Sequence, residues 1–81
     1  MKTTNTLPPD PEQMNEQRAA WAALALLQFQ SCCRTDDEDA LADLLCDLMH
    51  WADRTTFEFE AALARASMHY EAETSPIELA E

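Results

Sequence analysis

The chain has 81 residues, a net charge of −11, a hydrophobic content of 47%, no glycine and three cysteines. This length excludes more than one domain, and the lack of glycine excludes glycine-rich phosphate-binding loops. An odd number of cysteines (Cys32, Cys33 and Cys46) excludes a disulfide framework and predicts reduced thiols.

The composition predicts an all-α protein. Alanine and leucine are abundant, and the four prolines lie at positions 8, 9, 11 and 76, so nothing breaks a helix strongly between them. We expect a lead at residues 1–9, a single three-helix domain at residues 10–75 and a loose acidic tail at residues 76–81. No apolar run reaches the roughly 18 residues of a membrane span, which predicts a soluble protein of the cytoplasm.

The first helix is expected from Asp10, as the N-cap, to about Cys33. Its apolar residues lie on more than one side of the helix, which is typical of a helix buried on two faces. One face could contact a second copy of the chain, although packing within one chain is the simpler alternative. The residues expected at a dimer interface are Trp21, Leu24, Leu26 and Phe29.

The second helix is expected from a capping box of Thr35 and Glu38 to about Arg54. Its apolar positions (Leu41, Leu44, Leu45, Leu48 and Ala52) follow helical spacing, and the opposite face carries Asp39, Asp43, Asp47 and His50. The third helix is expected from Thr55 or Thr56 until shortly before Pro76. The short link predicts an antiparallel hairpin of the last two helices, with the first helix lying across it.

No set of residues predicts catalysis or a cofactor. Asp43, Asp47 and His50 could bind a divalent ion from one helical face, but a solvated polar surface is the simpler interpretation. The three cysteines lack the paired spacing of a zinc site and are interpreted as structural thiols. We therefore predict a protein that is not an enzyme and has no cofactor.

Negative charge is concentrated in the second part of the chain. Residues 1–35 carry three acidic and three basic residues, whereas residues 36–81 carry thirteen acidic and two basic residues. Asp39, Asp43 and Asp47, which we call the acidic stripe, repeat at about 6 Å along the helix and repel one another. Folding does not need this arrangement, so it indicates either solubility or a basic protein partner. Direct contact with nucleic acid or with an anionic membrane is disfavoured.

The segments ALADLLCDLMHWADR and FEFEAALARASMHYEAE resemble small acidic helical proteins encoded on bacterial mobile elements such as plasmids and phages. The resemblance covers about residues 40–73. It implies a protein of the anti-CRISPR type, several of which look like DNA to a CRISPR effector in the host cell.

The leading hypothesis is a non-enzymatic inhibitor that mimics DNA charge and binds a basic nucleic-acid-handling protein, such as a CRISPR effector complex. The alternative is a homodimeric helical accessory protein of a mobile element with no mimicry role. The residues expected to bind the partner are Asp36, Asp37, Asp39, Asp43, Asp47, His50, Trp51, Glu58 and Glu60.

Overall fold

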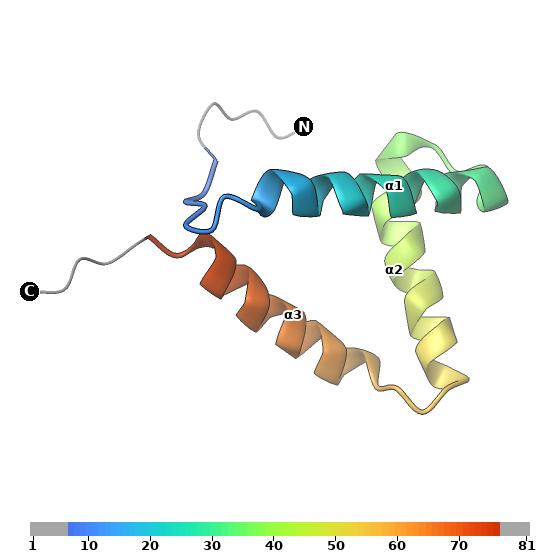
Figure 1. The fold of residues 1–81 in the computed structure, drawn as a ribbon. Helices are drawn as coiled ribbons and strands as arrows, with labels where there is room; N and C mark the ends of the chain where they lie inside the picture. Colours follow the sequence, from blue (N-terminus) through green and yellow to red (C-terminus); the bar gives the residue numbers. More distant parts are fainter. Residues whose placement is uncertain (1–6, 77–81) are drawn as a thin grey trace, which may run out of the picture.

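The computed structural model describes residues 7–76 and contains three helices, α1 (Asn15–Cys33), α2 (Asp37–Asp53) and α3 (Phe59–Thr74). These helices confirm the predicted all-α class, and no strand occurs in the described range. Figure 1 shows the helices as the sides of an open triangle, in which the end of α3 returns toward the start of α1. Most of the predicted lead and nearly all of the predicted tail lie outside the described residues.

The first helix begins at Asn15, so the predicted start at Asp10 is wrong by more than one turn. Gln13 adopts a left-handed backbone conformation with φ of 57°, which interrupts any helix between Asp10 and Asn15. The Asp10 carboxylate nevertheless caps the helix, because it accepts hydrogen bonds from the backbone N–H groups of Met14 at 3.2 Å and Asn15 at 3.3 Å.

The predicted capping box at the start of α2 is also wrong. Asp36 is the N-cap, and its side chain accepts a hydrogen bond from the backbone N–H of Asp39 at 3.0 Å. Arg34, with φ of 58°, ends α1 in a left-handed conformation and donates its N–H to the Gln30 carbonyl. The connection between the two helices is only Arg34, Thr35 and Asp36, and the Thr35 hydroxyl donates to Asp43 instead of capping α2.

The predicted close antiparallel hairpin of α2 and α3 is not confirmed. The two helices meet at the turn of residues 54–58 and diverge along their lengths (Figure 1). At the turn, the rings of Trp51 and Phe57 stack with their centroids 5.5 Å apart. An apolar hollow of about 160 Å³ lies beside them, lined in part by Ala52 and Phe59.

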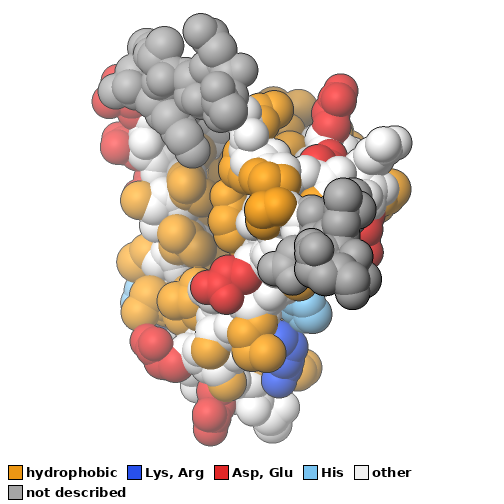
Figure 2. Space-filling model, turned by 90° about the vertical axis from the view of Figure 1, so that its left-hand side faces the viewer, with side chains coloured by type: hydrophobic (Ala, Val, Ile, Leu, Met, Phe, Trp, Pro, Cys, Tyr) orange, Lys and Arg blue, Asp and Glu red, His pale blue; other side chains and the backbone are white. Residues whose placement is uncertain are grey.

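The described chain has almost no core of its own. Its buried residues are Ala40 and Ala52, which are 4% and 7% exposed. Hydrophobic side chains make up much of the face drawn in Figure 2, and acidic side chains are scattered around it. The Cα radius of gyration is 15.5 Å, compared with about 12 Å for a compact domain of this length. The three helices therefore contact one another mainly near the corners of the triangle.

Candidate acidic interface

The acidic stripe lies on an exposed side of α2, as its spacing predicts. Asp39, Asp43 and Asp47 are all exposed. Residues four apart on a helix are neighbours on one face, so the three carboxylates form a row about 12 Å long. Trp51 continues the same row, because it follows Asp47 by four residues, and its side chain is 53% exposed. His50 is exposed beside this row.

Neither ion pair in the described part of the chain involves the acidic stripe. Arg54, the basic residue that follows the stripe in the sequence, donates from Nη1 to the carbonyl oxygen of His50 at 3.0 Å. The ion pairs found among residues 7–76 join Arg18 to Glu12 at 2.8 Å and to Glu73 at 3.6 Å. The stripe is therefore a row of carboxylates that its own described surroundings do not neutralise.

Three of the acidic residues predicted to bind a partner also make hydrogen bonds within the chain. Asp36 caps α2, and Asp37 accepts a hydrogen bond from Gln30 Nε2 at 2.7 Å. Asp43 accepts one from the Thr35 hydroxyl at 2.8 Å. These bonds hold the short connection between α1 and α2. Within the described residues, the carboxylates of Asp39 and Asp47 accept no such bond, so among these acidic residues on α2 they are the most available to a partner.

Glu58 and Glu60 lie where the turn that follows α2 leads into α3. Glu58 is the residue before α3, and Glu60 belongs to the first turn of that helix, where a negative charge favours the helix dipole. Both side chains are exposed, but the stacked rings of Trp51 and Phe57 lie between them and the acidic stripe along the chain. They add acidic surface next to Trp51 rather than extending the row on α2.

The negative charges of the acidic stripe influence the pKa of the Cys33 thiol. Local desolvation, the negative charge of Asp47, the neighbouring Cys32 and the charge of Asp43 together raise the pKa of Cys33 above its usual value. The thiolate is the reactive form of cysteine, so a raised pKa reduces the fraction that can react at a given pH. The C-terminal end of α1 therefore lies within electrostatic reach of the stripe on α2.

We expect replacement of Asp47 by Asn to speed the alkylation of Cys33. Removing one negative charge favours the thiolate, so the pH at which half of the maximal rate is reached should fall. The rate of iodoacetamide labelling between pH 7 and 10 measures this in a chain with Cys32→Ser and Cys46→Ser. Glu71→Gln, which removes a charge from α3, should leave the profile unchanged. An unchanged profile for Asp47→Asn would contradict the placement of Cys33.

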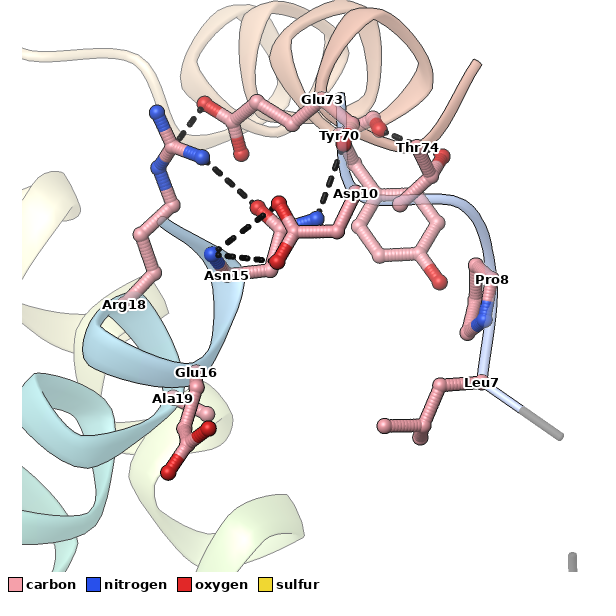
Figure 3. A pocket seen from close by; sticks show the side chains of 10 residues that line it. All are labelled: Leu7, Pro8, Asp10, Asn15, Glu16, Arg18, Ala19, Tyr70, Glu73 and Thr74. Carbon is pink, nitrogen blue, oxygen red and sulfur yellow. Dashed lines mark hydrogen bonds and ion pairs between the residues drawn. The ribbon is translucent and has the colours of Figure 1, made fainter. Parts of the chain in front are cut away.

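A second group of polar residues closes the corner between α1 and α3. Asn15 Nδ2 donates to the carbonyl oxygen of Glu73 at 2.8 Å, and Arg18 Nη1 donates to Asn15 Oδ1 at 2.7 Å (Figure 3). The hydrogen bond to Glu12 raises the pKa of the Arg18 guanidinium, which therefore stays charged. An open hollow of about 570 Å³, lined partly by Leu7 and Tyr70, lies next to this network. The network was not predicted, because no local sequence pattern links Asn15 and Glu73, which are 58 positions apart.

The polar groups at this corner are paired with one another, which is typical of a structural tie. In the described residues, no three His, Cys, Asp or Glu side chains lie together as a metal ion requires. None of the helices described is both long enough and apolar enough to cross a membrane. Comparisons with models of protein families, with curated proteins and with solved structures give no match for this chain.

Proposed function

We propose that this protein is a non-enzymatic inhibitor that binds a basic surface made for the nucleic-acid backbone, with a CRISPR effector complex as its leading target. The observation that carries the proposal is the acidic stripe. Its carboxylates are exposed, are held on a helix and make no ion pair in residues 7–76. Such a row repels itself, and this repulsion is not needed for folding, so we infer that its use lies in the attraction of positive charge.

The dimensions of the stripe suit a groove that holds a nucleic-acid backbone. Its carboxylates repeat at about 6 Å, and duplex DNA carries one phosphate per roughly 3.4 Å on each strand. Asp36, Asp37 and the acidic residues around the turn raise the density of negative charge toward that of a phosphate backbone. Lysine and arginine side chains that bind phosphates also bind carboxylates, which lets these acidic residues occupy such a groove.

Trp51 gives the stripe an apolar end. Its ring is stacked on Phe57 and is half exposed, so it is held in place and still has free surface. Aromatic residues in such positions often provide much of the binding energy of an interface, whereas exposed charges mainly speed association. The proposed complex therefore combines electrostatic attraction along α2 with an aromatic contact at its end.

Co-expression with a panel of CRISPR–Cas systems tests the proposal, with phage or plasmid escape as the readout. We expect loss of immunity in at least one system, caused by a block of target-DNA binding. DNA competition with the purified effector should then show inhibition that weakens between about 0.1 and 0.5 M salt, because salt screens exposed charges. Unchanged immunity across the panel overturns the CRISPR target, and inhibition that is indifferent to salt overturns mimicry.

A second candidate function is favoured by the many exposed hydrophobic side chains of the described helices. In this alternative, the chain is a homodimeric accessory protein of a mobile element, and its acidity serves only solubility. The protein would then self-associate, but replacement of the stripe carboxylates would change no activity. The two functions are compatible, since a dimer can also present two acidic stripes.

A further inference from the structure

One long segment of this acidic chain carries no charge. Residues 19–33, which form most of α1, contain no Asp, Glu, Lys or Arg, although the whole chain has a net charge of −11. A solvent-exposed helix normally has charged residues on its outer side. The absence of charged residues over about four turns of helix indicates that the outer side of α1 is not adapted to contact with solvent.

The two sides of α1 have different surroundings. Leu26 and Phe29 are half-buried and lie on the side of Asn15 and Gln30, whose side chains bond residues of α3 and of α2. The outer side of the helix is centred on Leu24 and is flanked by Trp21 and Leu27. These three side chains, which we call the α1 ridge, are 65%, 55% and 61% exposed, respectively.

The exposed area of the chain exceeds that of a compact protein of the same mass. A compact protein of 9.2 kDa exposes about 4,900 Å², whereas this chain exposes 7393 Å². If residues 1–6 and 77–81 are allowed the surface of a fully extended chain, roughly 1,200 Å² of the excess still remains. Two copies that covered this excess would bury about 2,400 Å², within the range of obligate homodimers.

We propose that the α1 ridge is a self-association surface and that a second copy of this chain covers it. The two α1 helices pack across a two-fold axis near Leu24, so that the same residues meet from both copies. Burial of Trp21, Leu24 and Leu27 against their counterparts gives the isolated triangle the core that it lacks. Of the four residues that the sequence predicts at a dimer interface, the ridge keeps Trp21 and Leu24.

The charge distribution allows a second copy to cover the α1 ridge. Two chains of net charge −11 repel each other least where they meet through surfaces without acidic residues, and the uncharged segment of α1 is such a surface. The acidic stripe belongs to α2, which packs against the inner side of α1. Pairing through the ridge therefore keeps the two stripes away from the interface. This inference does not rest on the proposed function.

Analytical ultracentrifugation of the full chain, without any partner, tests the proposal. We expect a dimer at micromolar concentration and at least a 30-fold weaker dimerisation for Leu24→Glu with Leu27→Glu, which is typical for the loss of central interface residues. Met68→Glu is the matched control, because Met68 is a similarly exposed apolar residue on α3. A wild-type monomer at 100 μM overturns the proposal, as does an equal loss of dimer in the control.

A second measurement needs no destabilising variant. In Trp51→Phe, Trp21 is the single tryptophan, and its fluorescence reports whether the α1 ridge is covered. We expect blue-shifted emission in the dimer, typical of a buried ring, and a shift to the red on dilution, with its midpoint at the dissociation constant. Emission typical of an exposed ring at every concentration overturns the ridge as the contact, even if the chain dimerises elsewhere.

Discussion

Replacement of Asp39 and Asp47 by Asn is expected to weaken the proposed inhibition more than about 100-fold, because each charged hydrogen bond lost costs about 1.5–3 kcal/mol, or about 3–6 kcal/mol for the two together. The two side chains are the best choice, since neither makes a hydrogen bond within residues 7–76, whereas Asp43 also bonds Thr35. The free energy of unfolding should change by less than about 0.5 kcal/mol, because relief of repulsion with Asp43 offsets the loss of charge near the helix start. Competition with target DNA measures the first effect, and urea unfolding measures the second.

The control for this variant removes the same number of charges elsewhere. Glu16→Gln with Glu71→Gln removes two negative charges as well, from exposed positions on α1 and α3. If total charge alone attracted the target, both double variants would weaken inhibition by the same factor. We expect the control to lose less than about threefold, which is the size of a general steering effect at moderate salt. Equal losses would show that the stripe has no special role.

Replacement of Ala40 by Leu should destabilise the protein by about 1–3 kcal/mol, the usual cost of overpacking a closely packed site. Ala40 is 4% exposed and lies in the first turns of α2, the helix that packs against α1. A larger side chain there pushes the helices apart. Since the described part of the chain buries only one other residue, Ala52, it has little else to compensate.

The shift of the urea midpoint measures this effect, and Ala42→Leu is its matched control. Ala42 is two residues further along the same helix and is exposed, so the added side chain finds room. The intrinsic helix propensities of the two substitutions are the same, which leaves packing as the difference. A destabilisation of equal size in both variants would contradict the close contact of α2 at Ala40.

Local patterns predicted the helices better than they predicted how the helices meet. The end of α3 shortly before Pro76 follows from the proline, and the structure confirms it, as it confirms the end of α1 expected at about Cys33. The start of α1 was wrong, because Asp10 and Pro11 give a normal start signal that the left-handed backbone of Gln13 overrides. A non-glycine residue with positive φ has no reliable signature in the sequence.

No pattern in the sequence predicted that α3 diverges from α2 and leaves the triangle open. A five-residue link allows a close hairpin, and only the position of Phe57 on Trp51 and the ties of Glu73 to Asn15 and Arg18 show that α3 diverges from α2. Such contacts depend on the packing of side chains distant in sequence. The same holds for the ridge, since helical spacing shows that α1 is apolar on two sides but does not say which side faces α2.

The candidate interface was easier to predict, because charge on one helical face is a local property. The spacing of Asp39, Asp43 and Asp47 is sufficient to place them in one exposed row. The hydrogen bonds of Asp36, Asp37 and Asp43 were not predicted, since they depend on the short connection after α1. Their binding roles, and those of His50, Trp51, Glu58 and Glu60, stay predictions.

The tie between Asn15 and Glu73 makes the path of the chain nearly circular. The start of α1 and the end of α3 meet at one corner, and the turn of residues 54–58 forms another corner (Figure 1). Protein architectures whose ends meet often tolerate a new order of connection. A permuted gene that joined residues 7 and 76 and opened the chain between Thr55 and Thr56 would keep every helix, so the triangle depends on its corners more than on chain order.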